Sequence, residues 1–241
     1  MIRTGCCALR SFLFYVLWIL YGVPWCLWVI LAAPCTRSVQ ARHRYLAQPF
    51  CRMTVVLCRL CCGIRWALEG AEHITARPCV IVSNHQSPWE TFFLQTLASP
   101  QTTVIKKELL QIPFFGWAFR VLDPIPIDRK EAHSSLQQVV KAGKKSLERN
   151  QWVMIFPEGS RHPWPETGRF NRGAAFTAQA AGAPVVPVVH DAGRYWPSGR
   201  WIKRPGTVRV KVGPALDSQA SSAAELTQQL REWIQENKNR D

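Results

Sequence analysis

An uncharged stretch of 23 residues near the start of the chain, from Ser11 to Ala33, limits the folds that are open to this sequence. As an α-helix it would extend about 35 Å, which is enough to cross the hydrocarbon layer of a bilayer. A cleaved signal peptide is the alternative, but its apolar core usually has only about 7 to 15 residues. Arg37, Arg42 and Arg44 follow directly. We therefore expect a retained membrane anchor whose carboxyl-terminal side faces the cytoplasm.

Pro24 lies inside this stretch and leaves two forms of the anchor open. A proline in a helix interior removes a backbone hydrogen bond and bends the axis. The segment would therefore either span the bilayer or form a re-entrant hairpin in one leaflet. A second segment, from Met53 to Leu68, mixes arginines with apolar residues and is predicted to be an interfacial helix that runs into the first strand.

The charge distribution supports contact with a lipid surface. The chain has a formal net charge of +14, and residues 1–62 contain seven arginines but no acidic residue. Basic side chains among tryptophans and aliphatic residues suit anionic headgroups and the bilayer edge. Nucleic acid is not expected as a partner, because no DNA- or RNA-recognition motif accompanies the basic residues. Residues 1–62 are thus predicted to be a membrane-anchoring segment, and residues 63–241 a single folded domain.

The nine cysteines predict neither disulfides nor a metal site. Most of them lie in or beside apolar stretches, without the spacing of small disulfide-rich secreted domains. The cluster of Cys58, Cys61 and Cys62 lacks a second ligand pair or a nearby histidine that would complete a tetrahedral set. A reducing, cytosol-facing compartment and no bound metal are therefore expected.

Beyond the anchor, short apolar runs alternate with helical patterns. The expected strands are 79–83, 102–105, 152–156, 185–189 and 207–212, and the expected helices are 89–97, 130–149, 172–181 and 223–237. This alternation predicts an α/β fold with a largely buried sheet.

A histidine directly follows the first of these expected strands. Asn84 and His85 lie at its carboxyl end, where α/β folds usually place their ligands. Pro88 suits the first position of a helix with Ser87 as its N-cap, so His85 would precede the helix and turn back towards Glu90. A histidine held by a carboxylate is suited to removing a proton from an alcohol. The same residues also fit a capping box, in which Glu90 binds the backbone N–H of Ser87, and the sequence leaves both open.

Several blocks in a fixed order resemble the lysophosphatidic acid acyltransferases, a family of glycerolipid acyltransferases. The first block is Asn84-His85 followed by Glu90, where the family has aspartate. The others are residues 106–109, 112–117, 127–129, 156–161 and 185–188. The block that ends in Arg129 is the family's second motif. In it, Asp123 replaces the usual glycine and Pro126 the usual phenylalanine. The likeness extends over about residues 64–214.

By this resemblance, residues 63–241 would be a catalytic domain with a central mixed sheet flanked by helices. His85 would be the general base and Glu90 its orienting partner. The reaction would transfer a fatty acyl group from acyl-CoA or acyl carrier protein to the sn-2 hydroxyl of lysophosphatidic acid, giving phosphatidic acid. The thioester is a co-substrate, and neither a cofactor nor a metal is implied. The partners would be membrane phospholipids, the lysophospholipid acceptor and the acyl donor, at the cytoplasmic side of a bacterial inner membrane. No oligomeric state is predicted.

The resemblance also assigns substrate-binding residues. They are Arg129, Glu158, Gly159 and Arg161 on the acceptor side, with Glu158 ordering the loop, and Val186 and Pro187 on the acyl-donor side. Guanidinium groups recognise a phosphate through paired hydrogen bonds. Arg129 also fits an ordinary exposed residue at the start of a helix, and the two donor-side residues fit an ordinary buried strand.

Two alternatives stay open for the function. One is the same chemistry on another lysolipid or on glycerol 3-phosphate, because such relatives share the first motif. The other is a catalytically silent membrane-associated scaffold, which the glutamate at position 90 and the altered second motif would favour. The remaining histidines have no carboxylate at a fixed spacing and are expected to be surface or structural residues. They are His43, His73, His133, His162 and His190.

Overall fold

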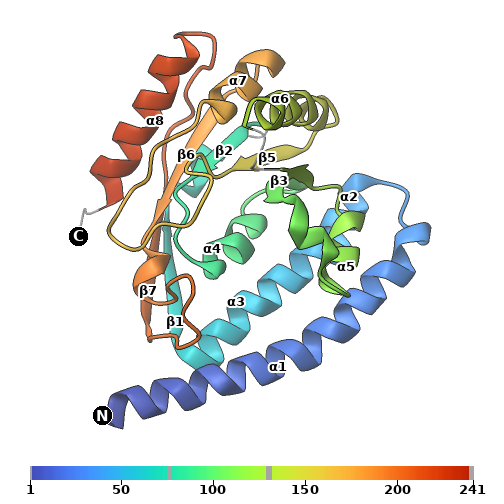
Figure 1. Cartoon of the computed structure of the whole chain (residues 1–241), viewed down its shortest axis with the longest axis vertical. Helices are drawn as coiled ribbons and strands as arrows, with labels where there is room; N and C mark the ends of the chain where they lie inside the picture. The colour runs from blue at the N-terminus through green and yellow to red at the C-terminus, as the bar shows by residue number, and fades with distance from the viewer. Residues whose placement is uncertain (1, 75–76, 129–131, 239–241) are drawn as a thin grey trace.

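The computed structural model describes residues 2–74, 77–128 and 132–238. Within these ranges the chain forms one seven-stranded sheet with helices on both of its faces (Figure 1). The strands are β1 (Ile64–Glu69), β2 (Val80–Ser83), β3 (Gln101–Lys106), β4 (Ile125–Ile127), β5 (Trp152–Ile155), β6 (Val185–His190) and β7 (Gly206–Val212). The α-helices are α1 (Ile2–Ala32), α2 (Val39–Arg42), α3 (Gln48–Cys62), α4 (Pro88–Phe93), α5 (Phe115–Val121), α6 (Ala132–Glu148), α7 (Gly173–Ala181) and α8 (Ala223–Lys238).

The sheet is mixed, as the sequence predicted. Its strand order is β1-β7-β6-β2-β5-β3-β4, and every neighbouring pair is parallel except β6 with β7. In the centre, Ile81 of β2 is paired with Met154 on one side and with Val186 on the other. Because β2, β5 and β6 run in the same direction, their carboxyl ends meet at one edge of the sheet. That edge is where the polar residues of the site follow the strands.

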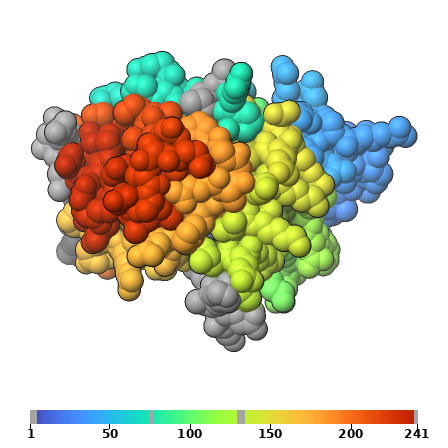
Figure 2. Space-filling model, turned by 90° about the horizontal axis from the view of Figure 1, so that it is seen from above, coloured from blue at the N-terminus to red at the C-terminus, as the bar shows by residue number. Residues whose placement is uncertain are grey.

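The central strands are apolar throughout because helices cover both faces of the sheet. The helices α1, α3 and α4 lie on one side, and α6, α7 and α8 form a continuous layer on the other (Figures 1 and 2). Ile81 and Val186 belong to the core beneath α3 and α4. Val80, Val185 and Leu230 belong to the core beneath α7 and α8. Alternate residues of one strand thus enter opposite cores, which accounts for the unbroken apolar runs.

The predicted helix from Met53 to Leu68 is wrong in its second half. Helix α3 ends at Cys62 because Gly63 adopts a left-handed conformation, with φ 69°, and its N–H caps the helix. The chain then continues as β1, whose residues pair in register with β7. A glycine just past the last helical residue is a common stop signal. The short strand β4 and helix α5 were also not predicted, because three and seven residues carry little periodicity.

Helix α1 continues through Pro24 without reversing direction, so the re-entrant hairpin is not formed within this helix. Instead α1 and α3 are the two arms of a helical hairpin against the domain (Figure 1). One side of α1 is buried, with Phe14 fully enclosed, while Leu20 and Leu31 on the other side are 66% and 73% exposed. By length and composition alone, residues 5–35 are apolar enough to cross a membrane.

The cap at Gly63 generates a stability prediction. Gly63→Ala should lower the free energy of unfolding by about 1–2 kcal/mol, because a side chain in the left-handed region is strained. The new Cβ would also lie 3.1 Å from Pro205 Cβ. Gly182→Ala is the matched control, since Gly182 caps α7 with φ 59° and nothing lies within 4 Å of an added Cβ. Chemical unfolding in detergent should show a larger loss for Gly63→Ala, and equal losses would contradict the role of the contact.

Candidate active site

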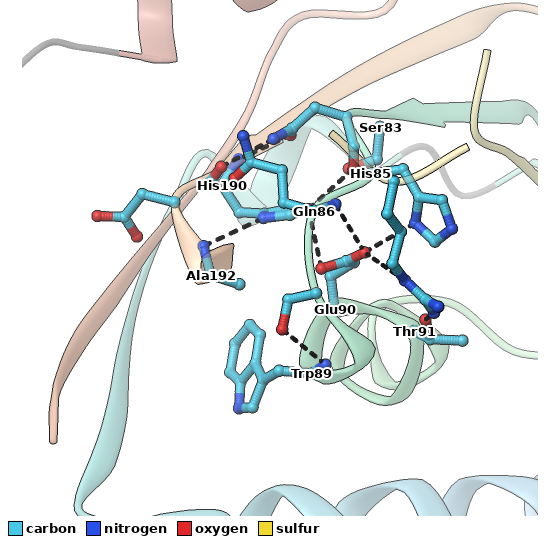
Figure 3. A network of polar contacts seen from close by, with 12 residues as sticks. Ser83, His85, Gln86, Trp89, Glu90, Thr91, His190 and Ala192 are labelled. Carbon is cyan, nitrogen blue, oxygen red and sulfur yellow. Dashed lines mark hydrogen bonds and ion pairs between the residues drawn. The ribbon is translucent and has the colours of Figure 1, made fainter. Parts of the chain in front are cut away.

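The chain leaves β2 and places His85 in the loop before α4. Ser87 is extended, with φ −146° and ψ 152°, and its hydroxyl accepts a hydrogen bond from the N–H of Trp89 at 3.0 Å. Pro88 is the first residue of the helix. This is the N-cap arrangement that the sequence predicted, and it leaves His85 outside the helix with its ring turned towards Glu90 (Figure 3).

Glu90 is fully buried and accepts two hydrogen bonds on one oxygen. Its Oε1 lies 2.8 Å from His85 Nδ1 and 3.1 Å from the backbone N of Gln86. The carboxylate is therefore hydrogen-bonded to the His85 ring and to the N–H of Gln86, and the capping box with the N–H of Ser87 is not formed. Burial would raise the pKa of Glu90, but His190, His85 and Arg161 together hold that pKa below its usual value. Glu90 is therefore ionised and fixes the proton of His85 on Nδ1.

His190 is part of this site, although the sequence analysis treated it as a surface or structural residue. It is fully buried at the end of β6, and its Nε2 lies 3.8 Å from Glu90 Oε2. The same nitrogen donates to the backbone oxygen of Asn84 at 2.9 Å, while Nδ1 accepts from the N–H of Ala192 at 3.3 Å. Burial lowers the pKa of His190, and the contact with the Asn84 oxygen places a proton on Nε2. The available signal was its place at the end of a strand, but only the pairing of β6 with β2 brings it here.

The side-chain amide of Asn84 also joins the two strand ends, through the backbone of His190. Asn84 Nδ2 donates to the His190 oxygen at 2.9 Å, and the His190 N–H donates to Asn84 Oδ1 at 3.1 Å. Both residues are buried. The asparagine of the first motif is thus a clamp between β2 and β6 that fixes the loop carrying His85.

The loop after β5 docks onto His85 from the other side. The N–H of His85 donates to Glu158 Oε2 at 3.4 Å, and the N–H of His162 donates to the His85 oxygen at 2.9 Å. Phe156 stacks on the His85 ring with centroids 4.1 Å apart. Gly159 has φ 71°, which allows the loop to turn between these contacts. Glu158 thus links this loop to the backbone of His85, and the role that the resemblance implied for it stays a prediction.

Burial raises the pKa of Glu158 to about 7. The His85 N–H, the positive charge of Lys238 and the Gly168 N–H oppose this shift, and the charge of Glu90 adds to it. Its side chain therefore changes charge near neutral pH while it supports the backbone of His85.

Arg161 extends from the same loop towards α4. Its Nη2 donates to Thr91 Oγ1 at 3.2 Å, and its Nε lies 4.0 Å from Glu90 Oε1. The side chain is 33% exposed, so it can still meet a ligand.

Arg129 lies outside the described residues. Strand β4, which ends two residues earlier at Ile127, runs parallel to β3 and thus leads to the same edge of the sheet as β5.

An apolar cavity of about 230 Å³ adjoins Arg161, between α1, α3, α4 and α5. Its walls include Trp25 of α1, Phe50 of α3 and Phe119 of α5, and Thr91 is one of its few polar lining residues. Val186 and Pro187 are buried inside β6 and do not line this cavity. Their link to the acyl donor stays a prediction.

Among the described residues, no group of three or more histidine, cysteine or acidic side chains could hold a metal ion.

Comparison with known proteins adds sequence and fold likenesses. Residues 65–191 match the family model described as acyltransferase. A Pseudomonas aeruginosa protein named 1-acyl-sn-glycerol-3-phosphate acyltransferase is 43% identical over 95% of this chain and 90% of its own length. The Limnanthes alba protein of the same name is 30% identical over 65% of this chain and 56% of its own. The crystal structure of the 1-acyl-sn-glycerophosphate (LPA) acyltransferase from Thermotoga maritima is 25% identical, with a TM-score of 0.78, and the match covers 98% of this chain and 94% of that one.

The raised pKa of Glu158 generates a pH-dependent prediction. Its pKa is about 7 in the folded protein against an ordinary value of 4.5. Between pH 4.5 and 7, Glu158 is therefore protonated in the folded state but ionised in the unfolded chain. The free energy of unfolding of the wild type should therefore fall, relative to Glu158→Gln, as the pH rises from 4.5 to 7, and stay lower above 7. Denaturant titrations at several pH values measure the difference, and parallel pH profiles would contradict the prediction.

Proposed function

This chain belongs to the acyltransferase family, and from that premise we propose that it transfers a fatty acyl group from a thioester to the sn-2 hydroxyl of 1-acyl-sn-glycerol 3-phosphate. The observation that carries the proposal is the 2.8 Å hydrogen bond between His85 Nδ1 and the buried Glu90 carboxylate. The names of the relatives from Pseudomonas and Thermotoga support this acceptor. The donor is acyl-CoA or acyl carrier protein.

His85 acts as the general base. Glu90 holds the proton of the ring on Nδ1, so Nε2 is the nitrogen that takes the hydroxyl proton of the acceptor. The acceptor oxygen then attacks the thioester carbonyl, the carbon–sulfur bond breaks, and the proton passes from the imidazolium to the leaving thiolate. The adjacent negative charge of Glu90 stabilises the imidazolium while it exists. No acyl-enzyme intermediate is needed, because the substrate supplies the nucleophile.

The extra methylene of Glu90 does not argue for a silent scaffold. The family's aspartate is one carbon shorter, yet Glu90 reaches His85 at hydrogen-bonding distance and is held in addition by the N–H of Gln86. A buried carboxylate with a depressed pKa and an oriented histidine is costly to maintain without a catalytic purpose. This arrangement favours an active enzyme over a silent scaffold.

Arg161 recognises the phosphate of the acceptor. It is the described arginine that both lies within 4.0 Å of Glu90 and keeps part of its surface exposed beside the cavity. A guanidinium forms paired hydrogen bonds with phosphate oxygens. The resemblance adds Arg129 to this role. With the phosphate held by Arg161, the glycerol hydroxyl lies towards His85 and the acyl chains towards the apolar cavity.

The substrates reach this site from a membrane on the side of α1 and α3. Exposed apolar residues on these helices include Leu20, Leu31 and Leu60, the last 71% exposed. The opposite side of α1 is packed against the domain, which fits a helix lying in one leaflet better than a solitary span. We place the catalytic domain at the cytoplasmic face of a bacterial inner membrane.

Acyl transfer by the purified protein tests the proposal. Wild type should convert lysophosphatidic acid and oleoyl-CoA, or an oleoyl carrier protein, into phosphatidic acid. His85→Ala should lower kcat by about 10²–10⁴, the usual contribution of a general base, with little change in the melting temperature. Labelled product is measured by thin-layer chromatography. Transfer that is confined to another lysolipid would reject the acceptor, and a fully active His85→Ala protein would reject the mechanism.

Arg161→Ala should weaken binding of the acceptor more than it lowers kcat. Loss of hydrogen bonds to a charged group costs about 1.5–3 kcal/mol, so KM for lysophosphatidic acid should rise by at least about tenfold. The effect should be much smaller for an acceptor without a phosphomonoester. Arg149→Ala is the matched control, because Arg149 is exposed and forms its ion pair with Asp123 rather than with a residue of the site. The two groups are 3.6 Å apart. Equal effects of Arg161→Ala on both acceptors would contradict phosphate recognition.

A further inference from the structure

A second concave surface lies between the first turns of α1 and the loop that joins β6 to β7. It has a volume of about 950 Å³, and its walls include Arg10 from α1 and Arg200, Trp201 and Arg204 from the loop. We call this surface the α1 groove. It shares no lining residue with the apolar cavity beside Arg161. The reaction proposed above makes no use of it.

The α1 groove is positively charged. Its three arginines are accompanied by no acidic lining residue, and the chain has no aspartate or glutamate between Asp191 and Asp217. Arg10 Nε donates to the Cys61 oxygen at 2.7 Å, which fixes this guanidinium at the groove wall. Such a surface attracts an anion, and guanidinium groups suit phosphate in particular.

The groove is also apolar, which distinguishes a lipid from a free phosphate ion. Trp201 is 52% exposed, and the adjoining turns of α1 expose Leu9 by 70% and Phe12 by 61%. Tryptophan and arginine beside exposed aliphatic residues are typical of side chains that lie at the headgroup level of a bilayer. A phospholipid presents a phosphate and an apolar body together, and thus complements both parts of the groove.

The two walls of the groove are held together by a buried lysine. Lys203 is 1% exposed, and its Nζ lies 3.5 Å from the ring centroid of Tyr15 and 4.2 Å from that of Trp196. Its N–H donates to Ser11 Oγ at 2.8 Å. Cations over aromatic rings in a desolvated site are held by about 2 kcal/mol or more, so the loop is fixed to α1. The groove therefore exists before a ligand arrives.

The same loop contacts the catalytic motif. The N–H of Ser198 donates to the backbone oxygen of Gln86 at 3.3 Å, one residue from His85. A ligand in the groove would thus lie on a loop that is hydrogen-bonded to the active site.

We propose that the α1 groove binds the phosphate headgroup of an anionic membrane glycerophospholipid that is not consumed by the reaction, through Arg10, Arg200 and Arg204. The proposal rests on the membrane docking proposed above. The bound lipid anchors the loop at residues 197–205 to the bilayer surface, as a second point of attachment besides the apolar face of α1.

Quenching of Trp201 fluorescence tests the groove directly. Brominated phosphatidylglycerol or brominated phosphatidylcholine is titrated into neutral detergent micelles that contain the full-length protein. Subtracting the signal of W201F isolates Trp201. Phosphatidylglycerol should reach half-maximal quenching at a mole fraction at least about fivefold lower than phosphatidylcholine, since one arginine near anionic lipid contributes about a factor of five. The double variant R200Q/R204Q should lower this preference, because Arg10 is then the one arginine left among the described residues of the groove.

K141Q/K145Q is the matched control, because it removes the same charge from exposed positions on α6, on the opposite side of the sheet. It should keep the preference for phosphatidylglycerol. Equal quenching by the two lipids in wild type would overturn the proposal, as would a preference that R200Q/R204Q leaves unchanged or that K141Q/K145Q lowers equally. The assay needs neither donor nor acceptor, so its result is separate from that of the transferase assay.

Discussion

The buried carboxylate of Glu90 is the group on which the arrangement of the site depends. A charge without solvent must be paired, or its burial costs far more than one interaction returns. Glu90 meets this requirement with donors from its own loop, a histidine from the end of β6 and an arginine from the loop after β5. Three strand ends that are distant in the sequence are therefore brought to one point. The parallel order of β6, β2 and β5 makes this possible.

Much of this could be predicted from local sequence. The strand before Asn84 and the proline at position 88 placed His85 ahead of a helix, and the ordered motifs predicted the family and the mixed sheet, all of which are confirmed. Asp123, where the family has glycine, has φ 53°, a left-handed conformation that glycine adopts freely and aspartate tolerates. The weakened second motif is thus a smaller departure than its letters indicate.

What could not be predicted depends on contacts between distant segments. His190 had only its place at the end of a strand as a signal, and strand order is what places it against Glu90. The choice between a capping box and a catalytic pair was also beyond the sequence, because both use the same spacing and differ only in which N–H or ring nitrogen the carboxylate meets. The end of α3 was misplaced because the apolar pattern continues across Gly63 while the backbone reverses its handedness. The local composition is similar on both sides of Gly63, although the structure changes there from a helix to a strand.

Helix α1 supplies Trp25, Cys26 and Val29 to the wall of the apolar cavity beside Arg161. The helix is therefore not an interchangeable module. A generic anchor of the same length and hydropathy would hold the domain at a bilayer but leave one side of the cavity open to lipid. With the acyl chains in this cavity, as proposed, selection on the anchor and selection on substrate binding act on the same side chains. The preferred length of the acyl chain and the attachment to the membrane would consequently change together in evolution.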